Sequence, residues 1–167
     1  MSTLAVIALG SNLGDRLTNL RAARDALRSI AVPGTLRQSS IYQTEPVACP
    51  DDSPDFFNAV VSFHYSENAA ELHAHTRSIE QKMGRARSSI NAPRTMDLDL
   101  LIFGAHTLQS YELEIPHPRL HLRRFVLEPL AEIHPDLPLP PHGNSIATLL
   151  SLLNSAEPAL QRVTSEW

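Results

Sequence analysis

The stretch that decides the fold is residues 56–65, Phe-Phe-Asn-Ala-Val-Val-Ser-Phe-His-Tyr. One face of this stretch is made of Phe57, Ala59, Val61, Phe63 and Tyr65, and the alternate positions 56, 58, 60, 62 and 64 make the other, which is the period of a β-strand. Asn68 follows and can cap a helix that runs to about Met83, where Gly84 supplies the stop. The inward stripe of this helix is expected to be Leu72, Ile79 and Met83.

Upstream and downstream segments extend this pattern. The apolar run Thr3 to Leu9 predicts a strand that ends at Gly10, and Asp15 can cap a helix behind it. That helix carries one apolar face, made of Leu17, Leu20, Leu27 and Ile30. Two more strands are predicted, at Arg37–Thr44 and at Asp97–Phe103.

The resulting order is βαββαβ, which is typical of an α+β sandwich with an antiparallel sheet and helices on one face. Phe125–Ile133 and Ile146–Leu153 predict two further short helices that pack on the remaining apolar surface. No element is predicted for residues 154–167. A length of 167 residues suits one domain, 1–167.

Composition restricts the class of protein. With 43% hydrophobic and 19% charged residues, the chain resembles neither a disordered nor a membrane protein, and the apolar run Leu4–Leu9 is too short for a span. The net charge of −4 gives no general attraction to nucleic acid or membranes. Cys49 is the single cysteine, so no intrachain disulfide forms and a cytoplasmic location is expected. We expect a monomer, because no long apolar stripe is left unexplained.

Asp97 and Asp99 are separated by one residue on a predicted strand. Their carboxylates therefore point to the same side, with Cα atoms roughly 6 to 7 Å apart, while Leu98, Leu100 and Ile102 take the other face. Two such carboxylates repel each other unless a hard cation such as Mg²⁺ neutralises them. The alternative interpretation is a solvated strand edge.

Arginines accompany this acidic pair. Of the 14 basic residues 13 are arginine, and four of these lie in the segment 77–94 just before the pair, namely Arg77, Arg85, Arg87 and Arg94. One guanidinium group can bind two phosphate oxygens at once. A carboxylate pair together with several arginines therefore favours the binding of a metal-bound nucleotide polyphosphate. The alternative is that these arginines are ordinary surface charges. His73 and His75, two residues apart on a helix, diverge and are expected at the surface.

Several motifs together resemble the 6-hydroxymethyl-7,8-dihydropterin pyrophosphokinases of the folate pathway. They follow in the family's order and are residues 8–15 (ALGSNLGD), 40–46 (SIYQTEP), 55–61 (DFFNAVV), 92–102 (APRTMDLDLLI), 115–118 (IPHP) and 123–133 (RRFVLEPLAEI). This resemblance implies a ferredoxin-like fold and transfer of pyrophosphate from ATP to the pterin hydroxymethyl oxygen, with release of AMP. It also implies two Mg²⁺ ions.

The resemblance assigns roles by position. Asp97 and Asp99 match the metal-binding pair, and Arg85 and Arg94 match catalytic arginines. The positions that match ATP contacts are Arg77, Glu80, Arg87, Leu100, His117 and Arg123, with Leu100 at the adenine. The positions that match pterin contacts are Thr44, Pro46, Val47, Phe56, Asn58 and Phe125. As same-face neighbours on a strand, Phe56 and Asn58 can supply an aromatic wall and an amide, although aromatic residues at this spacing also serve as plain core.

The chain departs from the family in one loop. Between Arg87 and Pro93 it is one residue shorter than a well-known form and has no Trp before Pro93, so closure over the pterin is expected to be built differently. Two other functions fit parts of the pattern. One is an RNA-binding module, which shares the βαββαβ order, and the other is a different Mg²⁺-dependent transferase with a D-x-D site.

Overall fold

The computed structural model describes residues 1–45, 54–84, 96–153 and 160–167. Within these residues six strands form one antiparallel sheet in the order β10-β3-β4-β1-β5, with β2 also paired to β4. The strands are β1 (Thr3–Ser11), β2 (Arg37–Gln38), β3 (Ile41–Thr44), β4 (Phe56–Tyr65), β5 (Asp97–Phe103) and β10 (Gln161–Thr164). The predicted α+β class with a ferredoxin-like strand order is confirmed.

Helices α1 (Arg16–Ile30) and α2 (Ala69–Lys82) begin at the predicted caps. Asp15 Oδ1 accepts a hydrogen bond from the Thr18 amide at 3.1 Å, and Asn68 Oδ1 accepts one from the Glu71 amide at 2.9 Å. Each bond satisfies one of the amide groups that a helix leaves unpaired in its first turn. The bond from Thr18 also lowers the pKa of Asp15.

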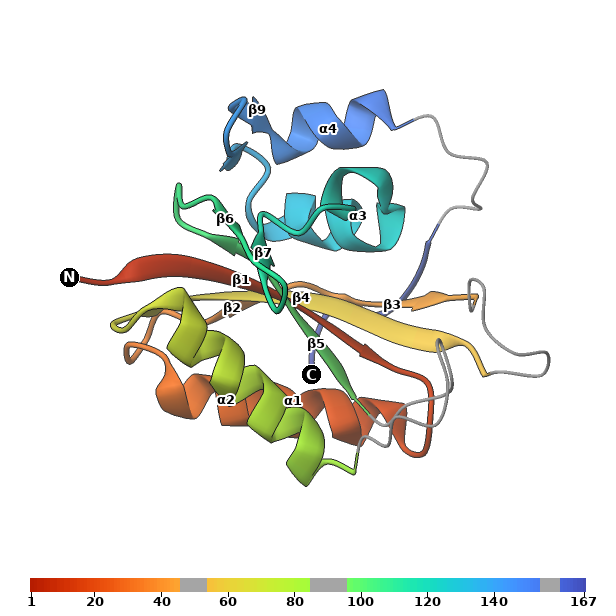
Figure 1. Ribbon diagram of the computed structural model, residues 1–167. Helices are drawn as coiled ribbons and strands as arrows, with labels where there is room; N and C mark the ends of the chain where they lie inside the picture. Colours follow the sequence, from red (N-terminus) through yellow and green to blue (C-terminus); the bar gives the residue numbers. More distant parts are fainter. Residues whose placement is uncertain (46–53, 85–95, 154–159) are drawn as a thin grey trace.

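The sheet carries helices on both faces (Figure 1). Helices α1 and α2 cover one face, whereas α3 (Arg124–Ile133) and α4 (Ile146–Leu152) cover the other. The expectation of helices on one face was therefore incomplete. An RNA-binding sheet presents an open face to stack bases, and α3 and α4 occupy that face here.

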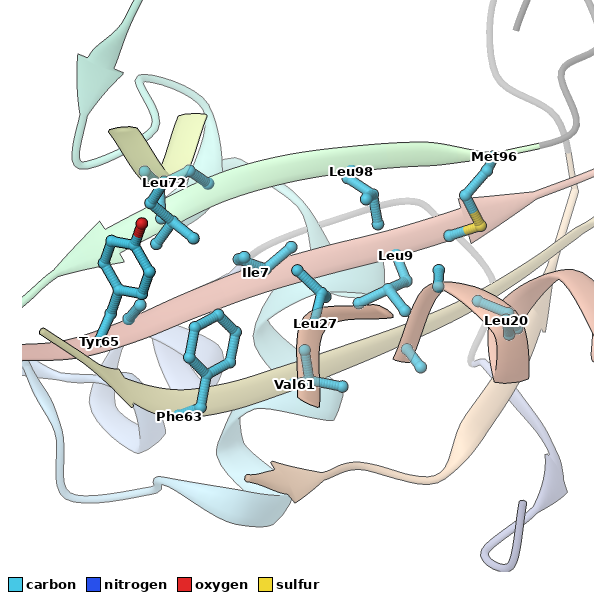
Figure 2. Close-up of a cluster of buried hydrophobic side chains, with 14 of the residues drawn as sticks. Ile7, Leu9, Leu20, Leu27, Val61, Phe63, Tyr65, Leu72, Met96 and Leu98 are labelled. Atoms are coloured by element: carbon cyan, nitrogen blue, oxygen red, sulfur yellow. The ribbon is translucent and has the colours of Figure 1, made fainter. Parts of the chain in front are cut away.

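Two hydrophobic clusters hold these layers together. Figure 2 shows the cluster between the sheet and α1 and α2, in which Leu27, Phe63 and Leu72 are fully buried. A second cluster joins the other face to α3 and α4 and includes Val60 and Leu127. Burying such a side chain contributes roughly 1.5–3 kcal/mol to folding. Because β4 carries apolar side chains on both of its faces, covering both faces of the sheet with helices stabilises the fold.

The structure differs from the predicted strands at two register shifts, each caused by one extra residue. The single strand predicted over Arg37–Thr44 is divided into β2 and β3, whose registers with β4 differ by one residue. In β5 the register shifts because Ile102 pairs with Val6 while Leu100 pairs with Ile7. Leu101 is thus the extra residue, and Ile102 packs under α3 instead of sharing a face with Leu98 and Leu100.

Short elements complete the fold. They are a 3-10 turn at Leu120–Leu122 and two hairpins, β6 (Leu108–Gln109) with β7 (Glu114–Ile115) and β8 (Pro138–Leu139) with β9 (Asn144–Ser145). In the parts of the chain that the structure describes, no helix has the length and apolar character needed to span a bilayer.

The segment after α4, for which no element was predicted, contributes β10 to the edge of the sheet. Trp167 packs against the α1 and α2 cluster, and its Nε1 donates a hydrogen bond to the Ser39 carbonyl at 2.8 Å. The Trp167 carbonyl in turn accepts from Gln38 Nε2 at 2.9 Å. This segment therefore covers the irregular junction between β2 and β3.

Candidate functional site

The acidic pair lies where β5 begins. Asp97 pairs with Gly10 and Asp99 pairs with Ala8 on β1. Leu98 and Leu100 belong to the core under α1 and α2, so both carboxylates project toward the opposite face, as the alternation predicted. Both aspartates are partly exposed, which leaves them accessible to a ligand.

A cavity of about 390 Å³ runs along this edge of the sheet, between α2 and residues 112–123. It brings together most of the predicted metal and nucleotide residues, which are Arg77, Glu80, Asp97, Asp99, Leu100, His117 and Arg123. Arginines and carboxylates line the same cavity. The cavity can therefore accept a polyanion together with a cation, which is the combination expected for a metal-bound nucleotide.

Glu80 joins α2 to the start of β5. Its side chain is 3% exposed, and Oε2 accepts a hydrogen bond from the Leu98 amide at 3.0 Å. Its Oε1 lies 3.9 Å from Arg77 Nε. Because β5 is an edge strand, this carboxylate satisfies a backbone donor that the sheet leaves unpaired, and it holds the acidic pair against the helix.

His117 lines the same cavity in its neutral form. Burial lowers its pKa to about 4, and the positive charges of Arg123 and Arg119 act in the same direction, while Asp97 opposes them. The Arg119 amide donates to Nδ1 at 3.2 Å, and the His117 amide itself donates to the Leu101 carbonyl at 2.9 Å. The neutral ring then carries its proton on Nε2, where it is a suitable donor for a phosphate oxygen.

A second group of predicted residues lies on β4, which is separated from β5 by the single strand β1. The Asn58 side chain is nearly buried, and its Nδ2 donates to Thr44 Oγ1 at 2.6 Å. A Cβ built on Gly10 would lie 3.2 Å from Asn58 Oδ1 and 3.6 Å from the Phe56 ring, so both side chains lie over Gly10. Phe56 and Asn58 therefore share a face, as predicted.

Phe125 belongs to α3, the helix that covers this face of the sheet. The guanidinium carbon of Arg123 lies 5.5 Å from the centre of its ring. Arg123 also lines the cavity beside the acidic pair, so this contact connects the two groups of residues. The aromatic ring and the amide are the kinds of group that a flat heterocycle requires.

Five predicted site residues lie outside the described part of the chain, namely Pro46, Val47, Arg85, Arg87 and Arg94. Among the described residues, no group of three or more His, Cys, Asp or Glu side chains is placed to hold a metal ion. Asp97 and Asp99 offer two carboxylates, and two carboxylates can be enough for Mg²⁺, because this ion usually keeps waters and substrate oxygens as its other ligands.

Sequence reasoning missed several residues of the cavity. His73 was expected at the surface but lines the cavity, as do Glu112, Glu114 and Arg119. His73 precedes Arg77 by four residues and Glu80 by seven, which places the three on one helix face and is a signal that the sequence contains. Glu112 and Glu114, before and within β7, show no comparable sequence pattern. They reach this edge of the sheet only through the three-dimensional fold.

The sequence is similar to those of known proteins. Residues 6–135 match the family described as 7,8-dihydro-6-hydroxymethylpterin-pyrophosphokinase (HPPK). The chain is 45% identical over 133 residues to the 2-amino-4-hydroxy-6-hydroxymethyldihydropteridine pyrophosphokinase of Bacillus subtilis, covering 80% of this chain and 79% of that protein. It is 41% identical over 146 residues to the protein of the same name from Synechocystis, covering 87% and 74%.

The fold is also similar to that of a solved structure, the Plasmodium falciparum HPPK-DHPS wild type with SDX-DHP. The TM-score is 0.71 at 13% sequence identity, over 90% of this chain. This chain spans 44% of the length of that protein. At such low identity the likeness concerns the fold.

Proposed function

Because this chain belongs to the 7,8-dihydro-6-hydroxymethylpterin-pyrophosphokinase family, we propose that it transfers pyrophosphate from ATP to the hydroxymethyl oxygen of 6-hydroxymethyl-7,8-dihydropterin and releases AMP. Family membership makes it a pyrophosphokinase of folate biosynthesis. The observation that carries the finer proposal is the adjacency of two sites. A cavity lined by arginines and by the paired carboxylates of β5 is separated by a single strand, β1, from an amide and an aromatic ring on β4.

The nucleotide occupies the cavity in this proposal. Arg77 and Arg123 neutralise phosphate charge, and His117 donates a hydrogen bond to a phosphate oxygen. Leu100 contributes an apolar surface for the adenine ring, and Glu80 fixes the strand below it. Arg85, Arg87 and Arg94, outside the described residues, would add positive charge around the transferring group.

Asp97 and Asp99 would hold two Mg²⁺ ions, and their chemistry fits that role. Both are oxygen ligands on a rigid strand, both face the same side, and both line the cavity proposed for the triphosphate. When bound, the ions would supply charge neutralisation at the phosphate oxygens. The carboxylates themselves fix where that charge is placed, because β5 is held between β1 and Glu80.

The pterin lies against β4 in this proposal. Asn58 offers hydrogen bonds to its amide-like edge, and Thr44 fixes the orientation of the Asn58 side chain. Phe56 and Phe125 provide aromatic walls on β4 and α3. Pro46 and Val47 lie two and three residues after Thr44 in the sequence and are proposed to cover this pocket. Such closure excludes water, which would otherwise compete with the alcohol for ATP.

Product analysis tests the proposal. Purified protein incubated with ATP, 6-hydroxymethyl-7,8-dihydropterin and Mg²⁺ is expected to give AMP and the pterin diphosphate in equal amounts. Formation of ADP or of free pyrophosphate would refute the reaction. Omission of Mg²⁺ should stop turnover, and a wild-type rate in a chelated sample would refute the metal requirement. Asp136→Asn, which changes an exposed carboxylate away from the cavity, is the matched control for Asp97→Asn.

A further inference from the structure

We propose that Gly10 is a specificity-determining residue of the pterin pocket, because its missing side chain sets the position of the Asn58 amide. The inference rests on the proposed function. Gly10 lies near the end of β1, between the two residues to which the proposal gives the pterin and the metal. Its role follows from the register of the sheet and from the space above its Cα atom.

The register places Gly10 in a row of four residues across the sheet. Tyr42 on β3 pairs with Asn58 on β4, Asn58 pairs with Gly10 on β1, and Gly10 pairs with Asp97 on β5. Neighbouring strands are about 4.8 Å apart, and residues in one row share a face. Gly10 is therefore the position in this row where the sheet presents only backbone between Asn58 and Asp97.

The space above Gly10 is used by its neighbours. A Cβ atom there would lie 3.2 Å from Asn58 Oδ1, which is closer than ordinary van der Waals contact, and 3.6 Å from Phe56 Cδ1. The three nearest atoms all belong to Asn58 and Phe56. A methyl group at this position would therefore press first against the side chains of Asn58 and Phe56.

Asn58 has little room to move away. On the side facing β3 its Nδ2 donates to Thr44 Oγ1 at 2.6 Å, and the residue is only 7% exposed. The amide is held between Thr44 and Gly10, so a shift of a few tenths of an ångström lengthens or turns the bond to Thr44. A group that reads a heterocycle edge tolerates such a shift poorly, because hydrogen bonds depend on distance and angle.

The backbone does not explain a glycine here. Gly10 has the extended conformation of a strand, unlike Gly14, Gly34 and Gly84, whose φ angles are positive. Alanine fits an extended strand without strain, and glycine inside a strand is itself unfavourable. The reason for glycine at position 10 is therefore the space that Asn58 and Phe56 require.

Gly10→Ala tests this inference, with a double-mutant cycle as its control. We expect Gly10→Ala to weaken binding of 6-hydroxymethyl-7,8-dihydropterin about tenfold, the effect of losing one well-placed hydrogen bond, while affinity for a nonhydrolysable ATP analogue changes less than twofold. In an Asn58→Ala background the same substitution should change pterin affinity less than twofold. Equal losses in both backgrounds, equal losses for both ligands, or unchanged pterin affinity in Gly10→Ala would overturn the inference.

A ligand-free measurement separates this inference from the proposed function. The side-chain amide signals of Asn58 in a ¹⁵N NMR spectrum should shift in Gly10→Ala, while the thermal unfolding midpoint stays close to that of the wild type. Unmoved Asn58 signals overturn the role of Gly10, whatever the substrate is. Failure of the wild-type protein to bind the pterin, with shifted Asn58 signals, overturns the proposed substrate and leaves the positioning effect established.

Discussion

Glu132→Ala removes a carboxylate that joins α3 to β3, and its cost follows from the hydrogen bonds. Glu132 Oε1 accepts from the Ser40 amide and from the Tyr42 hydroxyl, both at 2.9 Å, and Oε2 accepts from Ser40 Oγ at 2.7 Å. A hydrogen bond contributes about 0.5–1.5 kcal/mol net. Water can reach the exposed Glu132, so we expect the lower end of this range for each of the three bonds. The expected loss in the free energy of unfolding is therefore about 1.5 kcal/mol.

Glu132→Gln is the matched control. Its amide oxygen can still accept from the Ser40 amide, and its amide nitrogen can donate to the Ser40 hydroxyl. We therefore expect a loss of only about 0.5 kcal/mol. Urea unfolding followed by the fluorescence of Trp167, the single tryptophan, measures both variants. Equal stabilities for Glu132→Ala and the wild type would refute the claim that the hydrogen bonds of Glu132 to Ser40 and Tyr42 stabilise the fold.

The same carboxylate predicts a pH dependence. Burial raises the pKa of Glu132, but hydrogen bonds from Ser40 and Tyr42, aided by Arg162, outweigh burial and hold it below the ordinary value of 4.5. A carboxyl group with a lowered pKa stabilises the fold above that ordinary value, and the contribution is lost as the pH falls through the folded-state pKa. The wild type should therefore lose more stability than Glu132→Gln below about pH 4.5. Identical pH profiles would contradict this.

Three further predictions concern the cavity. Asp97→Asn should abolish turnover without changing the unfolding midpoint, as shown by steady-state kinetics and calorimetry; a wild-type rate would remove Asp97 from the site. The His117 ring should titrate in NMR spectra of the protein alone with a pKa of about 4; since the unfolded chain binds that proton more readily, stability should fall as the pH drops below about 6.5. Glu80→Ala should lower the free energy of unfolding by about 2 kcal/mol, because the Leu98 amide loses a charged acceptor. Denaturant titration measures this change, and a stability equal to that of the wild type would contradict the role of Glu80.

The sequence predicted the elements whose apolar period is strong. The alternation along β4 and the caps at Asp15 and Asn68 are local properties, so they are visible without the fold. The bulge at Leu101 was invisible, because a bulge is defined by the partner strand. β10 was missed for a related reason, since the residues Gln-Arg-Val-Thr have no apolar period and pair with β3 through their backbone.

The candidate site divides in the same way. The shared face of Asp97 and Asp99 follows from two residues on one strand and was predictable. The hydrogen bond from the Leu98 amide to Glu80 was not predictable, because it joins residues 18 apart in the sequence through the packing of α2 against β5. The row that places Gly10 between Asn58 and Asp97 depends on the registers of three strands, which periodicity cannot supply.

The pairing of β10 with β3 also bears on solubility. An uncovered strand edge offers its free amide and carbonyl groups to other chains, and such edges promote aggregation. β10 occupies that edge of the large sheet. It has only four residues and carries the charged side chain of Arg162, and both features make an edge strand a poor template for further pairing. The pairing of β10 with β3 thus removes one free strand edge through which copies of the chain could associate.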